Sequence, residues 1–218
     1  DASVQATAPR VGMVNRIING DMRVAQRGTA AVTSSEAFPV DRFRSTNTTN
    51  GTYSAQQSSV APTGFNNSTI VTITAVQTAG TGNLSIAQNV EGFNIADFGW
   101  GTAAAQTVTL SFWVRCSVTG TFGGVLRNVD STRSYPYTYT ISSVDTWEYK
   151  TLSISGDTTG TWNTSNLRGV EVRFALFSSA TQTSGSWYAG NATGATGQTQ
   201  LASTSGATFY VTGVQLEK

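Results

Sequence analysis

The closing stretch FYVTGVQLEK, residues 209–218, is the part of the sequence that decides the fold. Its apolar residues alternate with mostly polar ones, in the order Phe209, Val211, Val214 and Leu216. This is the pattern of a strand with one buried face. The alternation slips by one residue at Gly213, which predicts a β-bulge. A strand at a chain end ties that end into a sheet, so we expect the two final charged residues to mark where the chain leaves it.

The same two-residue period recurs along the chain, in residues 52–60, 68–76, 83–90, 107–118, 122–129, 135–142, 147–154 and 170–178. Runs rich in Gly, Ser, Thr and Asn separate these segments, and only residues 91–99 could form a single helical turn. Parallel strands need long crossover connections, usually helices, and the sequence offers none. The pattern therefore predicts an all-β protein, an antiparallel jelly-roll β-sandwich of about eight to ten strands.

The N-terminal part of the chain differs in pattern from the rest. Residues 1–13 are small and polar and predict an arm or linker, which leaves residues 14–218 as a single jelly-roll domain. The stretch VNRIINGDMRVAQRG, residues 14–28, predicts two short strands or one bent strand around the Asn-Gly pair. The stretch AFPVDRFR, residues 37–44, contains a proline and predicts an edge segment or an extended connection.

Composition excludes several classes of function. Charged residues are 11% of the chain, with 13 Lys and Arg against 12 Asp and Glu, so no broad field attracts nucleic acid or an anionic membrane. No window approaches the roughly 18 apolar residues of a membrane span. The single cysteine, Cys116, has no partner for an internal disulfide. The chain has no histidine, which excludes a Ser-His-Asp triad. Neutral polar molecules and the surfaces of other proteins remain as candidate binding partners.

Three regions resemble the tail fibre type of virion proteins of tailed bacteriophages and prophages. They are NRIINGDMRVAQRGT (15–29), the central VTLSFWVRCSVTGTFGGVLRN (108–128) with RSYPYTYTI (133–141) and DTWEYKTLSISGDTTGTWNT (145–164), and GATFYVTGVQLEK (206–218). The resemblance implies a virion protein that assembles as a homo-oligomer, expected to be a trimer, contacts other virion proteins and recognises a host surface glycan. The same order of elements is similar, more loosely, to carbohydrate-binding jelly rolls attached to glycoside hydrolases.

Aromatic residues in loops are the candidate glycan contacts, because sugar rings stack on Trp and Tyr while their hydroxyls pair with polar groups. Trp100, Trp162, Trp187 and Tyr188 lie in Gly- and Asn-rich loops. Packing against the ends of the sandwich or against another subunit is the alternative for these four. Trp113 and Trp147, in contrast, lie in strands and are expected to be structural.

A second set of candidates comes from the run RSYPYTYT. Arg133 leads into it, and Tyr135, Tyr137 and Tyr139 share one strand face by the period of two. This row of rings is interpreted as a sugar platform or, equally, as a subunit contact.

Calcium is the one metal that the sequence suggests. The looser similarity implies a structural calcium beside the terminal strands, and Asn19, Asp21, Asp41 and Glu217 supply oxygen ligands of the kind calcium requires. The alternative is that Asn19 and Gly20 form a turn in which Asp21 accepts backbone hydrogen bonds. No cofactor is required by either interpretation.

The sequence therefore predicts a non-enzymatic phage tail fibre module that binds a host glycan, located in the virion and inserting into no membrane. A structural virion component, such as a capsid decoration protein or a fibre spacer, is the first alternative. A depolymerase or glycosidase is the second and is disfavoured, because no pair of acids stands out by its spacing.

Overall fold

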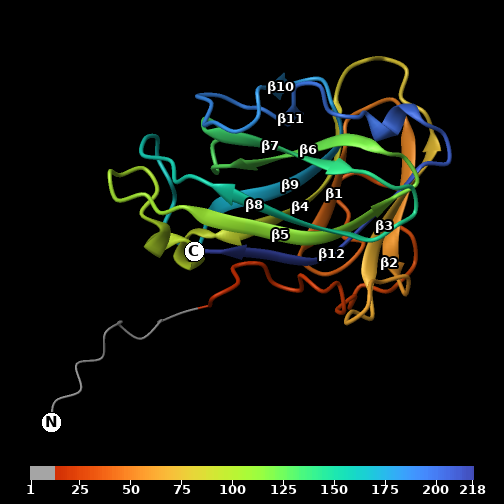
Figure 1. Ribbon diagram of the computed structural model, residues 1–218, viewed down its shortest axis with the longest axis horizontal. Coiled ribbons are helices and arrows are strands. Elements are labelled where there is room, and N and C mark those ends of the chain that lie inside the picture. Colours follow the sequence, from red (N-terminus) through yellow and green to blue (C-terminus); the bar gives the residue numbers. More distant parts are fainter. Residues whose placement is uncertain (1–12) are drawn as a thin grey trace, which may run out of the picture.

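The closing stretch forms β12 (Thr208–Glu217), a central strand that pairs with β3 (Ser68–Ala75) on one side and β5 (Val108–Cys116) on the other. In the computed structural model, which describes residues 13–218, β12 runs alongside β5 (Figure 1). The chain end is thus held by hydrogen bonds from two neighbours, as the sequence predicts.

The remaining elements are short strands and three turns of 3-10 helix. They are β1 (Phe43–Asn47), β2 (Thr52–Ser58), β4 (Asn83–Glu91), η1 (Gly92–Asn94), η2 (Ala96–Phe98), β6 (Gly120–Arg127), β7 (Ser134–Ile141), β8 (Glu148–Ile154), β9 (Arg168–Ser178), β10 (Thr181–Gln182), β11 (Gly194–Ala195) and η3 (Leu201–Ser203).

Two five-stranded antiparallel sheets make the sandwich, in the orders β1-β4-β9-β6-β7 and β2-β3-β12-β5-β8. We call them the first and the second sheet. The short strands β10 and β11 pair in parallel apart from both. Every segment predicted as a strand from its alternation contains one, and residues 37–44 end in β1 at an edge of the first sheet. The antiparallel jelly-roll prediction is confirmed.

Aromatic rings fill the space between the sheets. Phe112 of the second sheet lies 4.9 Å from Phe174 and 5.0 Å from Tyr139 of the first sheet, measured between ring centroids. Phe209 of β12 stacks at 6.2 Å on Phe122. Cys116 is buried in the same core as a free thiol, where burial raises its pKa to about 11. The inward faces of both sheets are therefore closed, and any binding surface lies on the outer faces or in the loops.

Residues 14–28 form no strand, so that prediction is wrong. Arg16 N–H donates to the carbonyl of Leu216, and Val214 N–H donates to the carbonyl of Gly20. The segment thus follows β12, beneath it in Figure 1, without continuous pairing. Asn19 and Met22 have φ values of 58° and 59°, left-handed conformations that break a strand.

The predicted bulge is present at Gly213. The pairing of β12 with β5 shifts between Thr212 and Gln215, and Gly213 has φ 61°. A Cβ atom there would lie 2.7 Å from Cζ of Phe65. The bulge therefore needs glycine both for its backbone and for the close approach of this ring.

Gly213→Ala is expected to lower the free energy of unfolding by about 1–2 kcal/mol from the left-handed backbone alone, and by more from the contact with Phe65. Urea denaturation measures this. Gly206→Ala is the matched control, because its φ is 72° and a Cβ atom there meets nothing within 4 Å. Equal losses in the two variants would show that the contact with Phe65 contributes nothing.

The predicted arm, residues 1–13, lies outside the described residues except for Met13. Within residues 13–218, no helix is long and apolar enough to cross a membrane.

Candidate functional site

Charged side chains gather on the outer face of the first sheet. Along β9, Val170, Val172 and Phe174 point into the core, so the intervening Glu171 and Arg173 point outward. Glu171 pairs in register with Arg127 of β6. On the other side of β9, Ala87 of β4 pairs with both Arg173 and Arg44 of β1. Topology thus brings arginines from three separate strands to one glutamate.

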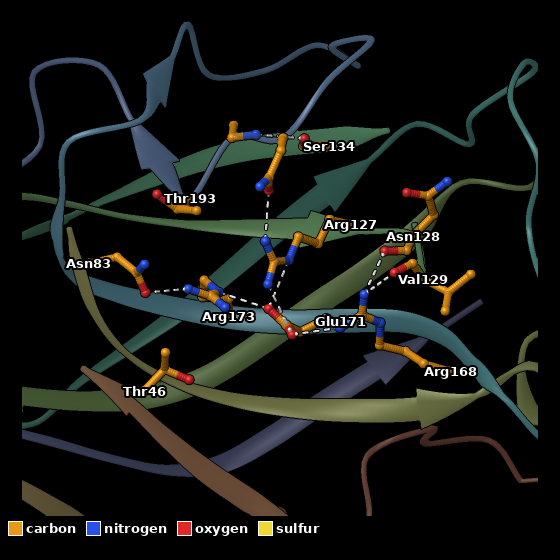
Figure 2. Close-up of polar contacts among 12 residues, drawn as sticks. Thr46, Asn83, Arg127, Asn128, Val129, Ser134, Arg168, Glu171, Arg173 and Thr193 are labelled. Carbon is orange, nitrogen blue, oxygen red and sulfur yellow. Dashed lines mark hydrogen bonds and ion pairs between the residues drawn. The ribbon is translucent and has the colours of Figure 1, made fainter. Parts of the chain in front are cut away.

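Glu171 is the centre of this cluster, as Figure 2 shows. Its carboxylate oxygens lie 2.7 Å from Nε of Arg173 and 3.0 Å from Nε of Arg127. Arg44 and Arg168 each approach through a terminal nitrogen at 3.2 Å. The side chain of Glu171 has no solvent exposure. One fully buried carboxylate therefore holds four guanidinium groups, and we call these five residues the arginine cluster.

The protonation of Glu171 follows from these neighbours. Burial by itself would raise the pKa of Glu171, but the charges of Arg173 and Arg127 and their hydrogen bonds lower it from 4.5 to about 2. The carboxylate is consequently ionised at any pH near neutrality.

Neutral groups fix the outer ends of the arginines. Nη1 of Arg173 donates to Oδ1 of Asn83 at 2.8 Å, and Nη1 of Arg127 donates to Oδ1 of Asn191 at 2.7 Å. Arg168 donates to the backbone carbonyls of Asn128 and Val129. Each of these guanidinium planes is thus held from two sides, which gives the donors fixed directions.

The arginine cluster forms one wall of a pocket of about 400 Å³. Every residue that lines the pocket is polar or charged: Glu36, Arg44, Thr46, Asn83, Arg127, Ser131, Arg168, Arg173, Asn191 and Thr193. Ala87 lies between Arg44 and Arg173 in the strand register, so these two arginines share one face of the sheet. Glu36 lies exposed and pairs with Arg44. This is a preformed hydrogen-bonding site on an outer sheet face.

The sequence analysis missed this site. Its one signal was in RGVEVRF, residues 168–174, where charged residues occupy alternate positions of an otherwise apolar strand. Alternation puts Glu171 and Arg173 on one outer face. It does not show that β1 and β6 bring further arginines to the same place.

Three of the predicted loop aromatics do come together, in a packed group. The ring centroid of Trp100 lies 4.7 Å from that of Trp162 and 5.2 Å from that of Trp187, and Tyr135 lies 5.2 Å from Trp187. Only 6% of Trp100 and 8% of Trp162 is exposed. Trp187 is partly exposed and donates from Nε1 to the carbonyl of Ser155 at 2.8 Å. We call Trp100, Trp162, Trp187 and Tyr135 the tryptophan cap; sugar contact by it stays a prediction.

The other predicted glycan contacts lie in different surroundings. Arg133 forms a two-point ion pair with the buried Asp157, from Nε and Nη2 at 2.7 Å each. Tyr137 is 3% exposed, and its hydroxyl donates to the carbonyl of Arg173. Tyr188 is 39% exposed. Sugar contact by Arg133 and Tyr188 stays a prediction.

The tyrosine run does not form a surface platform. Tyr135, Tyr137 and Tyr139 share one face of β7, as the sequence predicts, but this face points into the sandwich and all three are buried. Pro136 and Thr138 take the outward positions. The interpretation of this row as an exposed ribbon is wrong, because a period of two identifies a shared face and not which face is buried.

Three of the four candidate calcium ligands, Asn19, Asp21 and Asp41, line one pocket. Among the described residues, no group of three or more His, Cys, Asp or Glu side chains is placed to hold a metal, so Asp21, Asp41 and Glu217 do not meet. Asn19 instead donates to the carbonyls of Val24 and Asp41 and accepts from Val24 N–H. Asn19 is thus a turn residue and Glu217 does not join the two aspartates, while a calcium bound beside Asn19, Asp21 and Asp41 stays a prediction.

Four other aromatics lie on the outer face and rim of the second sheet. Trp113 lies 5.4 Å from Tyr149, and Trp147 lies 6.1 Å from Tyr210, between ring centroids. Tyr149 is 51% exposed and the other three are partly exposed. Trp113 and Trp147 were expected to be structural, yet the structure presents both at the surface. We call these four residues the aromatic strip.

Comparison with known proteins gives likeness of fold. No family model matches the sequence, and no curated protein matches it. The enzymatically active domain of tailspike protein 4 of bacteriophage CBA120 has a TM-score of 0.50 and 12% identity over 94% of this chain, which spans 21% of that chain. A family 11 carbohydrate-binding module of the cellulase Lic26A-Cel5E of Clostridium thermocellum has a TM-score of 0.41 and 14% identity, covering 87% of this chain and 95% of that one. A CBM4 structure has a TM-score of 0.44 and 14% identity, covering 92% and 98%. At 12% identity, the likeness to the tailspike domain is one of fold alone.

Proposed function

We propose that this chain is a non-enzymatic glycan-binding module and that the sugar binds in the pocket beside the arginine cluster. The observation that carries the proposal is the composition of that pocket: every lining side chain offers a hydrogen-bond donor or acceptor, and several are fixed by one another. A sugar ring presents hydroxyls on all sides, so it needs such a set of directed partners.

Stability alone does not account for the arginine cluster. Taking charges out of water costs several kcal/mol per ion, and well-packed apolar residues are often as stabilising as a buried ion pair. The outer face of a sheet would normally carry exposed polar residues. A cluster of buried charges on that face is an exception to this pattern, and such exceptions occur most often at functional sites.

The acids of the pocket support binding over catalysis. Glycosidases generally need two carboxyl groups across the scissile bond, one of them protonated near neutral pH. Glu36 and Glu171 both pair with Arg44. The low pKa of Glu171 leaves it without a proton to donate. Glu171 is therefore not suited to act as a general acid.

The resemblance to tail fibre proteins supports a finer form of the proposal. We place the module at the tail of a tailed-phage virion, as a homotrimer that contacts other virion proteins and a host surface glycan. The fold likeness to a phage tailspike domain agrees with this place. Three weak sites on one trimer would gain affinity through their high effective concentration.

The aromatic strip favours one alternative, a structural virion component. Aromatic residues at the surface are typical of protein interfaces. The exposed Tyr149 and the partly exposed Trp113, Trp147 and Tyr210 lie together in this way. A fibre spacer or capsid decoration protein would bury this face against a neighbour and would bind no sugar.

A glycan array tests the proposal on the purified protein, with Asn83→Ala as the pocket variant. Asn89→Ala is its control, because Asn89 lies on the same strand and does not line the pocket. Trp113→Ala tests the aromatic strip. We expect binding by the wild type, the control and Trp113→Ala, and a clear loss in Asn83→Ala. A loss in Trp113→Ala alone would contradict the assigned site, and a wild type that binds no glycan would contradict the function.

A further inference from the structure

Positive charge is in excess in the pocket. Its walls carry the guanidinium groups of Arg44, Arg127, Arg168 and Arg173. Among residues 13–218, the carboxylates in contact with them are those of Glu36 and Glu171. The exposed Asp130 acts on Arg168 through space. The whole chain has a formal net charge of only +1, so this excess is local.

Several donors of these arginines have no protein partner among the described residues. A guanidinium group has five N–H donors. Arg173 uses one toward Glu171 and one toward Asn83, and Arg44 uses one toward Glu171 and one toward Glu36. Within the part of the chain that the structure describes, Nη2 of Arg173 has no hydrogen bond to protein. Arg44 and Arg173, which both line the pocket, therefore keep donors for a ligand.

Burial makes this excess charge costly in the absence of a ligand. Arg173 is 2% exposed and Arg127 is 8% exposed, so water screens their mutual repulsion poorly. Burial lowers the pKa of Arg173, the charge of Glu171 opposes this, and the nearby charge of Arg127 lowers it further. An added negative charge would reduce that repulsion and would accept the free donors at once.

We propose that the ligand of this pocket carries an acidic group on a sugar, and that Arg44, Arg168 and Arg173 receive it. The inference rests on the proposed function and specifies its ligand class. The planar guanidinium group of arginine can donate two parallel hydrogen bonds to a carboxylate, and the oxygens of sulfate and phosphate esters can accept them in the same way. Thr46, Asn83 and Thr193 then face the uncharged hydroxyls of the same sugar.

The shape of the charged region favours a single acidic sugar unit over an extended polyanion. The pocket holds about 400 Å³, enough for a small ligand, and its arginines converge on one point. Binding to a nucleic acid backbone relies on basic residues spread along a groove or face.

Isothermal titration calorimetry with matched ligand pairs tests the inference. Each pair consists of an oligosaccharide of galacturonate, glucuronate, mannuronate or sialic acid and the same oligosaccharide with its carboxyl groups reduced to alcohols. Sulfated and phosphorylated oligosaccharides form a second arm, and polyglutamate is the anion without a sugar. We expect at least one acidic oligosaccharide, of either arm, to bind about 10-fold or more tightly than its uncharged counterpart, the usual scale of charge-assisted hydrogen bonds.

Two variants link the effect to the arginines. Arg44→Gln and Arg168→Gln should each reduce the preference for the acidic ligand over its uncharged counterpart about 10-fold. Each variant leaves Glu171 with three arginine partners, which preserves the fold. Arg115→Gln is the matched control, because the side chain of Arg115 is 22% exposed and that of Arg44 is 23% exposed, and Arg115 lies on the second sheet.

The outcomes separate the two proposals. Equal binding of acidic and uncharged members in every pair would overturn the acidic ligand and leave glycan binding in place. Polyglutamate binding as tightly as the acidic sugars would overturn the requirement for a sugar. If no sugar of either kind binds, both proposals fail.

Discussion

Replacing Glu171 by glutamine is expected to lower the free energy of unfolding by about 3–5 kcal/mol, the usual result of removing one partner from a buried ion pair. Glutamine keeps the size of the side chain and one acceptor oxygen, so the change isolates the charge. Four guanidinium groups would then share the site with no buried counter-charge. Urea denaturation measures the loss.

Arg44→Gln serves as the control for this result. Arg44 is partly exposed, and Glu171 keeps three other partners without it, so we expect a loss of at most about 1 kcal/mol. Equal stability of Glu171→Gln and the wild type would contradict the view that charge holds the arginine cluster together.

The same residue makes stability depend on pH in the acid range. Its pKa is lowered in the folded state from 4.5 to about 2, because the charges of Arg173 and Arg127 outweigh the effect of burial. The native state therefore binds fewer protons than the unfolded state between these values, and its stability rises with pH there. About 3 kcal/mol is present above pH 4.5 and is lost as pH falls toward 2.

Comparison of variants identifies the group responsible. Denaturation at a series of pH values should show a smaller acid loss in Glu171→Gln than in the wild type. Burial would raise the pKa of Asp157, but its hydrogen bonds to Arg133 and Thr159 lower it. Asp157 therefore keeps its own contribution to the loss of stability in acid in both proteins. Identical acid profiles would show that Glu171 does not titrate as described.

The fold could be predicted from the sequence because strand alternation is a local property. The bulge at Gly213 and the inward-facing residues of β12 follow from ten consecutive residues. The burial of Tyr137 could not be predicted from the sequence, because alternation leaves open which face of β7 meets the other sheet. The helical turn in residues 91–99 was likewise visible locally and appears as η1 and η2.

The pocket could not be predicted because its residues are distant in sequence. Arg44, Arg127 and Arg173 belong to β1, β6 and β9, and only the order β1-β4-β9-β6-β7 places them around Glu171. The composition of the chain gave no sign of the local excess of positive charge, for a related reason. A charged fraction of 11% with nearly equal signs excludes a broad field, yet four of the arginines converge on one sheet face. Averages over a chain say little about a site that the topology assembles.

Trp162→Ala is expected to lower the free energy of unfolding by about 3–5 kcal/mol, the usual loss for a buried tryptophan. Trp162 is 8% exposed and packs at 4.7 Å from Trp100 and 5.2 Å from Trp187. Its Nε1 also donates to Oδ2 of the buried Asp157 at 3.2 Å. Truncation would leave a cavity and remove one of the donors that hold this carboxylate ionised.

Trp187→Ala is the matched control within the tryptophan cap. Trp187 is partly exposed, so its truncation should cost less than that of Trp162. Urea denaturation gives both values, and titration with a glycan found on the array gives the affinity of the folded fraction. If the pocket holds the sugar, both variants keep the wild-type affinity at temperatures where they remain folded. A Trp162→Ala protein that is folded but no longer binds the glycan would instead place the glycan site at the tryptophan cap. The rings of the cap would then be buried only in the absence of ligand.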